Sequence, residues 1–159
     1  MARSHEGVPT ARFYQLAGSS LETALAALLA KILERNGRAC VLARDALHLR
    51  QLDELLWRHP PQRFLPHGPW DGPDPERQPV LLALEPDDRN GATILLLASP
   101  RPVADTTRFD MVVDFVTSRE DHLLEARARY RDYRRQGCLM EYWVQSADGR
   151  WTRQEKREG

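Results

Sequence analysis

The chain has 159 residues, of which 42% are hydrophobic and 29% charged, with 23 basic and 23 acidic side chains that balance to zero net charge. This length and composition predict one globular domain. Apolar runs stay well short of the roughly 20 residues that cross a bilayer, and the N-terminus lacks an apolar signal segment. We therefore expect a cytoplasmic protein without membrane contact. The two cysteines lack metal-ligand spacing, and we expect neither a metal site nor a cofactor.

Strand and helix patterns alternate along the first third of the chain. A short apolar strand is expected at residues 13–16. The helix that follows is expected to begin near Ser19, because Ser19 and Glu22 have the spacing of a capping box. A buried strand at 39–43 is followed by a second helix, which Asp45 caps. This order predicts parallel strands joined by right-handed crossovers. The side chains expected to face the core are Leu21, Leu25, Leu28, Leu29 and Ile32 on the first helix and Leu49, Leu52, Leu55, Leu56 and Trp57 on the second.

The middle of the chain contains a proline-rich stretch and then more strands. Seven prolines between residues 58 and 79 predict a long irregular loop. Apolar strands at 80–84 and 93–97 are separated by turn-forming residues, and this pattern predicts a hairpin. Further strands are expected at 110–116 and, at a sheet edge, at 139–144.

These elements predict a three-layer Rossmann-like α/β sandwich with a mixed, mostly parallel sheet. We expect the domain to span residues 12–145, preceded by a flexible extension at 1–11 and followed by a polar tail at 146–159. Proteins with this fold often bind nucleotides, but the first strand-to-helix turn offers only Gly18 where the dinucleotide fingerprint needs three glycines.

Catalytic motifs are absent from the sequence, so we predict that the protein is not an enzyme by itself. The sequence contains neither a phosphate-binding loop of the GK[ST] type nor a serine in a nucleophile elbow. Asp110 and Asp114 are expected on the same face of one strand, where a paired-acid site is conceivable, although structural roles are favoured. A nucleotide-linked enzyme on this fold stays open as an alternative.

The region after the strand at 110–116 is the most informative part of the sequence. Five arginines fall between residues 127 and 135, and helical spacing aligns Arg127, Arg131 and Arg134 beside Tyr130. Guanidinium groups bind carboxylates and phosphates bidentately, and a neighbouring ring adds apolar surface. The pattern predicts a site for an anion that carries an apolar group. A solvated charged face without a ligand is the alternative. A second face of the helix is expected to pack on the core and carries Leu123, Ala126, Tyr130, Tyr133 and Gly137, so that Tyr130 borders the arginines.

Five short motifs occur in order along the chain. They are FY at 13–14, LDELLW at 52–57, FLPH at 64–67, VVDF at 112–115 and ARARYRDYR at 126–134, the last followed by Gly137. Together, across residues 12–144, they resemble the chi-subunit family of bacterial DNA polymerase III holoenzyme. The resemblance implies a non-catalytic adaptor of the clamp loader in DNA replication. Such an adaptor binds the psi subunit on one surface and, on another, the acidic, phenylalanine-terminated C-terminal tail of single-stranded-DNA-binding protein.

The resemblance also implies which residues serve the tail. Arg127, Tyr130 and Arg131 match the tail-binding positions of the family, and Arg134 joins them on helical spacing alone. Leu123 departs from the family pattern, because a basic residue is expected there, and the cationic patch is correspondingly narrower.

A second group of residues is assigned to partner surfaces less directly. Phe64, Pro66 and His67 match a loop that we assign to psi binding; the alternative is that Phe64 tucks under the domain. Trp57 matches a position near the partner surfaces, and we group it with the tail site, core packing being the alternative.

Direct binding to single-stranded nucleic acid is a further alternative, because arginine and tyrosine also serve phosphates and stacked bases. The zero net charge and a basic patch confined to one helix speak against it. We therefore expect single-stranded DNA to be reached mainly indirectly, through the protein that coats it.

Overall fold

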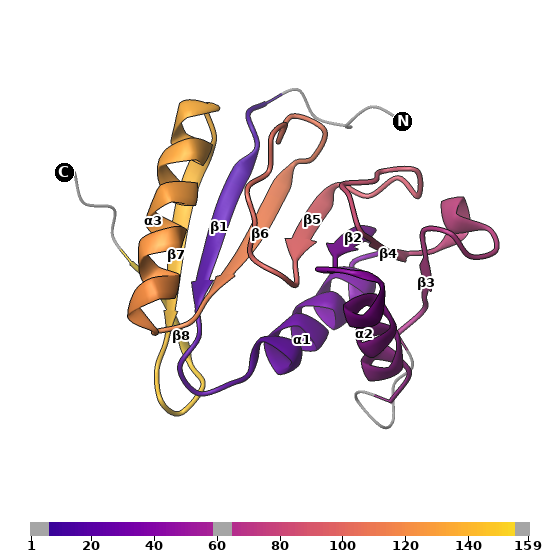
Figure 1. The fold of residues 1–159 in the computed structure, drawn as a ribbon, viewed down its shortest axis with the longest axis horizontal. Coiled ribbons are helices and arrows are strands. Elements are labelled where there is room, and N and C mark those ends of the chain that lie inside the picture. Colours follow the sequence, from indigo (N-terminus) through magenta and orange to yellow (C-terminus); the bar gives the residue numbers. More distant parts are fainter. Residues whose placement is uncertain (1–6, 59–64, 155–159) are drawn as a thin grey trace.

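A computed structural model of the chain describes residues 7–58 and 65–154. These residues form an eight-stranded sheet covered by α-helices on both faces (Figure 1). The predicted three-layer α/β sandwich with a mixed, mostly parallel sheet is confirmed. In chain order the elements are β1 (Thr10–Gln15), α1 (Leu21–Glu34), β2 (Ala39–Leu42), α2 (Ala46–Arg58), β3 (His67–Pro69), the 3-10 helix η1 (Pro75–Arg77), β4 (Val80–Ala83), β5 (Ile94–Leu97), β6 (Met111–Val116), α3 (Glu120–Arg135), β7 (Leu139–Gln145) and β8 (Trp151–Arg153).

The strand order is β3-β4-β2-β5-β6-β1-β7-β8. The predicted hairpin between the fourth and fifth strands is wrong, because β4 and β5 lie on either side of β2 and both run parallel to it. Every residue of β4 and nearly every residue of β5 is buried. A continuously apolar strand suits an interior position in a parallel sheet, because both faces of such a sheet are covered. A hairpin with one face exposed to solvent would instead alternate apolar and polar residues.

The sheet extends further at both chain ends than the sequence predicts. β1 begins at Thr10, inside the expected extension, and pairs with both β6 and β7. Residues 151–153, expected in a polar tail, form β8 and pair antiparallel with β7, so β7 is not at the edge. Trp151 explains the difference, since its ring packs against Tyr14 with centroids 4.8 Å apart. The burial of one large ring gives this short strand a stable position.

The sheet separates two hydrophobic cores. One core packs α1 and α2 against one face, and the other packs α3 and the loop residues Val103 and Phe109 against the opposite face. Strand alternation assigns β6 to both cores, with Val113 and Phe115 on the first face and Val112 and Val116 on the second. Figure 1 shows α3 beside β7 at one end of the sheet, with α1 and α2 gathered toward the other end.

The turn between β1 and α1 is organised by a side chain from β7. The Gln145 side-chain oxygen accepts hydrogen bonds from the backbone N–H groups of residues 17–19, at 2.9–3.1 Å. Its amide nitrogen donates to the Ser19 hydroxyl at 3.0 Å. Ser19 is therefore occupied, and the helix is capped instead by Ser20, which accepts from the Thr23 backbone N–H. The second helix is capped as predicted, with the Asp45 carboxylate accepting from the His48 N–H at 2.9 Å.

Replacement of Gln145 by alanine is expected to lower the free energy of unfolding by about 1–3 kcal/mol, because it leaves partly buried donors without acceptors. Gln145 itself is buried. Chemical denaturation of Gln145→Ala measures the loss, and Gln145→Glu, which keeps the acceptor oxygens, is the control. Equal stability of the alanine variant and the unchanged protein would show that the turn does not depend on this side chain.

Candidate functional site: the outer face of helix α3

Three arginines line the outer face of α3. Arg127, Arg131 and Arg134 are exposed, as their helical spacing predicts, and we call them the arginine stripe. Among the described residues, no carboxylate forms an ion pair with any of the three. Asp132, the acid nearest in sequence, contacts Arg135 and Gln136 instead. The three guanidinium groups are therefore available to an external anion.

Tyr130 lies next to the stripe and is half-buried. Its ring packs on Phe13 of β1 with centroids 5.6 Å apart, and Phe13 also contacts Tyr133 and Tyr142 at 5.7 Å each. Burial raises the pKa of Tyr142, the charge of Asp114 adds to this effect, and the nearby charge of Arg127 partly offsets it. Arg127 is therefore close enough to Tyr142 of β7 to influence its ionisation. The site consequently presents cations beside a ring whose position is fixed by the core.

The orientation of α3 is fixed by a buried ion pair. Arg129 points inward and donates to both carboxylate oxygens of Asp114 on β6, at 2.8 and 2.9 Å. The Tyr133 hydroxyl donates to the same carboxylate at 3.2 Å. Desolvation lowers the pKa of Arg129, but the hydrogen bonds and charge of Asp114 outweigh it, so that pKa is raised. Since a bidentate pair has a defined geometry, it sets the rotation of α3 and turns the stripe to solvent.

The same contacts decide the role of Asp114. Both of its oxygens are occupied by Arg129 and Tyr133, and the residue is fully buried. It is therefore structural, as favoured from the sequence. Sequence reasoning did not identify Arg129 as the partner of Asp114, although the sequence contains a feature that points to such a pair. A carboxylate within an otherwise apolar strand requires a buried cation, and the helix that follows this strand supplies arginines on more than one face.

The other predicted site residues lie elsewhere. Trp57, expected to face the core, is 60% exposed. Its ring contacts the His67 ring, with centroids 5.4 Å apart. Trp57 lies at the end of α2, which covers the opposite face of the sheet from α3, so the structure does not bring it to the arginine stripe.

His67 is buried beneath Trp57. Its Nδ1 lies 2.6 Å from the Leu65 carbonyl oxygen, and its Nε2 lies 2.9 Å from Asp53 Oδ1 on α2. Pro66 is exposed beside it, and Phe64 lies outside the described residues. His67 therefore ties the start of β3 to α2, while Trp57 and Pro66 form the accessible surface. The predicted irregular loop contains β3 and η1, so it is more ordered than its proline content suggested.

Comparison with known proteins agrees with the resemblance. The sequence model of the family described as DNA polymerase III chi subunit, HolC, matches residues 8–141. The chain belongs to this family. It is 31% identical to DNA polymerase III subunit chi of Escherichia coli (strain K12) over 122 residues, which cover 73% of this chain and 80% of that protein. It is 23% identical to the probable DNA polymerase III subunit chi of Rickettsia prowazekii (strain Madrid E) over 137 residues, 82% of each chain.

The arginine stripe lies within the matched region of this chi-family protein. Leu123, which departs from the family pattern, is partly buried against the α3 core, and Leu124 beside it is exposed. The first turn of α3 carries Glu120 and Asp121. The cationic surface is consequently confined to the C-terminal two-thirds of the helix.

Two further observations concern the described part of the chain only. Residues 7–58 and 65–154 contain no group of three or more histidine, cysteine or acidic side chains that could hold a metal ion. None of the helices in these residues is long and apolar enough to cross a membrane.

Proposed function

We propose that this chi-family protein is a non-catalytic accessory subunit of the clamp-loader complex in the cytoplasm. In this role it binds the C-terminal tail of single-stranded-DNA-binding protein through the arginine stripe and Tyr130, and it binds the psi subunit through a separate surface. The two contacts together link the polymerase assembly to coated single strands during DNA replication.

The observation that carries the tail assignment is the set of unpaired guanidinium groups beside a fixed tyrosine ring. A peptide that ends in acidic side chains, an aromatic ring and a free carboxylate presents several anionic groups around one apolar group. Arg127 and Arg131 are one helical turn apart, which allows one to bind the terminal carboxylate while the other binds an acidic side chain. The phenyl ring of the peptide then packs against Tyr130.

A second surface is proposed for psi, around Pro66 and Trp57. Both side chains are exposed, and the buried His67 ring packs against Trp57. We move Trp57 from the tail site to this surface, because it contacts His67 and lies on the helix that covers the other face of the sheet. Separate surfaces allow an adaptor to hold both partners at once.

The absence of catalysis is also part of the proposal. Asp114 is fully engaged by Arg129 and Tyr133 and cannot serve as a free acid or base. The alternative of a nucleotide-linked enzyme on this fold is tested by measuring whether nucleotides stabilise the protein against thermal unfolding.

The experiment that tests the tail assignment is a pull-down with the C-terminal peptide of single-stranded-DNA-binding protein, with and without its final phenylalanine. We expect retention of the protein on the complete peptide and its loss on the truncated one. Equal retention on both peptides would contradict the proposed pairing of an apolar ring with Tyr130.

The two surfaces predict opposite effects of two substitutions. Phe64→Ala is expected to weaken psi binding and to leave tail binding unchanged, while Arg127→Ala is expected to do the reverse. Truncation of an aromatic anchor at an interface often costs about 2 kcal/mol. Affinity measurements with each partner separately check the pattern, and circular dichroism establishes that both variants are folded. If Phe64→Ala unfolds the domain, Phe64 belongs to the core, and the assignment of this residue to psi is wrong.

A further inference from the structure

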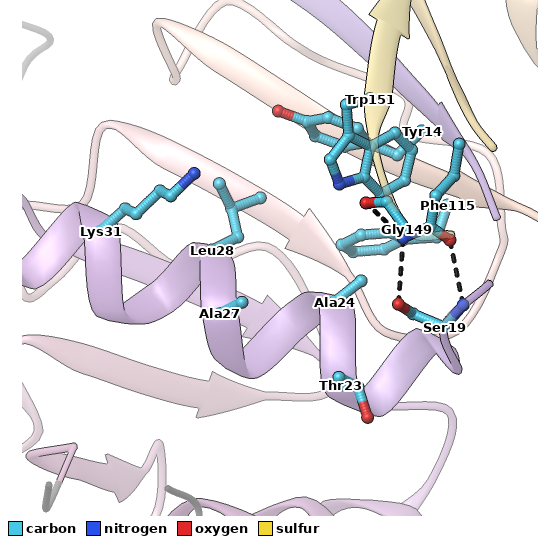
Figure 2. A pocket seen from close by; sticks show the side chains of 11 residues that line it. Tyr14, Ser19, Thr23, Ala24, Ala27, Leu28, Lys31, Phe115, Gly149 and Trp151 are labelled. Atoms are coloured by element: carbon cyan, nitrogen blue, oxygen red, sulfur yellow. Dashed lines mark hydrogen bonds between the residues drawn. The ribbon is translucent and has the colours of Figure 1, made fainter. Parts of the chain in front are cut away.

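A slot lies between α1 and the face of the sheet that α1 covers (Figure 2). Its volume is about 230 Å³. One wall is aromatic and consists of Tyr14, Phe115 and Trp151; the opposite wall is the α1 surface formed by Ala24, Ala27 and Leu28. An aromatic wall that faces small aliphatic side chains suits a flat ring. The slot also lies near the carboxyl ends of β1 and β6, the edge at which open parallel sheets bind ligands.

The aromatic wall is held in place by contacts among its own rings. Tyr14 contacts Trp151 edge-on at 4.8 Å and stacks on Phe115 at 6.0 Å, both between centroids. On its other side Tyr14 approaches Trp143, and the Arg12 guanidinium lies over both of these rings at 5.9 and 5.8 Å. A ligand would therefore meet a wall already in position, so little ordering cost would accompany binding.

The two ends of the slot differ in polarity. Ser19, Gln145 and Gly149 lie together at one end, joined by hydrogen bonds from the Gln145 amide nitrogen to the Ser19 hydroxyl and the Gly149 carbonyl. Lys31 lies at the other end and is exposed. Among the described residues, Lys31 is the only charged side chain that lines the slot, and no carboxylate pairs with it. The slot therefore combines a polar end, flat apolar walls and a cationic end.

We propose that this slot binds one base of single-stranded DNA, with an adjoining phosphate on Lys31. A nucleotide carries groups that match the slot in the same order: a polar base edge for the polar end, a flat ring for the apolar walls and a phosphate for the cationic end. An apolar peptide side chain would match the walls but not the polar end. Lys31 is one turn of α1 beyond Ala27, about 6 Å along the helix axis, which suits the distance from a base to its phosphate. Stacking on aromatic rings tolerates any base, so the contact would not depend on sequence.

This site is independent of the proposed tail contact. The slot lies on the face covered by α1, and the arginine stripe lies on α3 over the opposite face. Gln145, Gly149 and Trp151 also lie beyond residues 8–141, the part of the chain that the family's sequence model matches. A protein that uses both surfaces would contact the coating protein and an exposed stretch of the strand together.

The test measures binding of a fluorescently labelled oligothymidylate of about 16 nucleotides to the full chain at low salt. Trp151→Ala is expected to weaken binding by about 5- to 150-fold, the range for loss of one stacked base, while Trp151→Phe retains most of the affinity. Lys31→Glu is expected to weaken binding and to reduce the dependence on salt by about one phosphate contact. Thymidine monophosphate should compete weakly, and duplex DNA should bind less well, because its bases are already stacked.

Matched control variants distinguish an effect at the slot from a general effect of charge reversal or of the loss of an exposed tryptophan. Arg50→Glu makes the same change of charge sign at an exposed position of α2, and Trp70→Ala removes an exposed tryptophan outside the slot. Both are expected to bind the oligonucleotide as the unchanged protein does. Lys31→Glu keeps the test decisive if Trp151→Ala loses stability, because Lys31 is an exposed surface residue. Three outcomes would each overturn the proposal. The unchanged protein would fail to bind the oligonucleotide, or Lys31→Glu and Arg50→Glu would bind it equally well. In the third, the slot variants would lose affinity for the tail peptide and keep their affinity for DNA.

Discussion

Asp114→Asn is expected to lower the free energy of unfolding by about 3–5 kcal/mol, the usual cost of removing one partner from a buried ion pair. The amide has nearly the same shape as the carboxylate, so the loss reflects the uncompensated charge of Arg129 and not a cavity. Arg129 is 8% exposed, and its guanidinium has no other carboxylate partner among the described residues. Urea denaturation measures the difference, and the slope of free energy against denaturant shows whether unfolding remains two-state.

The double variant Asp114→Leu with Arg129→Met serves as the control for this prediction. Replacement of a buried pair by apolar side chains of similar size is often close to neutral. We therefore expect the double variant to be more stable than Asp114→Asn. If Asp114→Asn unfolds at the same urea concentration as the unchanged protein, the pair does not hold α3 in place, and the orientation of the stripe needs another explanation.

Arg127→Ala combined with Arg131→Ala is expected to remove most of the affinity for the tail peptide. Each lost charge-assisted hydrogen bond is worth about 1.5–3 kcal/mol, and the two arginines bind different anionic groups of the same peptide. Stability should change by less than about 0.5 kcal/mol, because both side chains are exposed. Calorimetric titration with the peptide measures the loss.

Arg135→Ala is the matched control for the double variant. Arg135 is also exposed near the end of α3, but it lies outside the stripe and contacts Asp132 at 3.7 Å. Its removal takes one positive charge from the same helix, and we expect tail affinity to change little. Comparable losses in Arg135→Ala and Arg127→Ala would mean that the peptide responds to overall charge and not to a defined site.

The parts of the fold that depend on apolar periodicity were predictable from the sequence. The helices α1 and α2 and the interior strands follow directly from their spacing of leucine and valine. Strand neighbours were not predictable in the same way, because pairing is decided between distant segments. The strands at 80–83 and 94–97 look like a hairpin in sequence, yet β2 lies between them. β8 was missed because three residues carry too little pattern, and its position depends on the packing of Trp151 against Tyr14.

In the candidate site, too, local spacing was predictable from the sequence and contacts between distant segments were not. The stripe follows from helical spacing, and Arg127, Arg131 and Arg134 are exposed as expected. The ion pair that orients them could not be assigned, because five arginines compete for one buried carboxylate and only packing selects Arg129. Trp57 was misplaced for a related reason. A tryptophan in the last turn of an amphipathic helix fits the core pattern, but in the structure the buried His67 ring packs against Trp57 and Trp57 stays exposed.

The measurement that tests the central claim most directly is calorimetric titration of the unchanged protein with the C-terminal peptide of single-stranded-DNA-binding protein at two salt concentrations. We expect saturable one-to-one binding that weakens as salt rises, because exposed arginines form the contacts. We also expect that removal of the terminal phenylalanine abolishes binding, since the ring and the carboxylate are lost from their positions together. Absence of heat with the complete peptide, or equal binding of the truncated one, would contradict the assignment of the α3 face as the tail site.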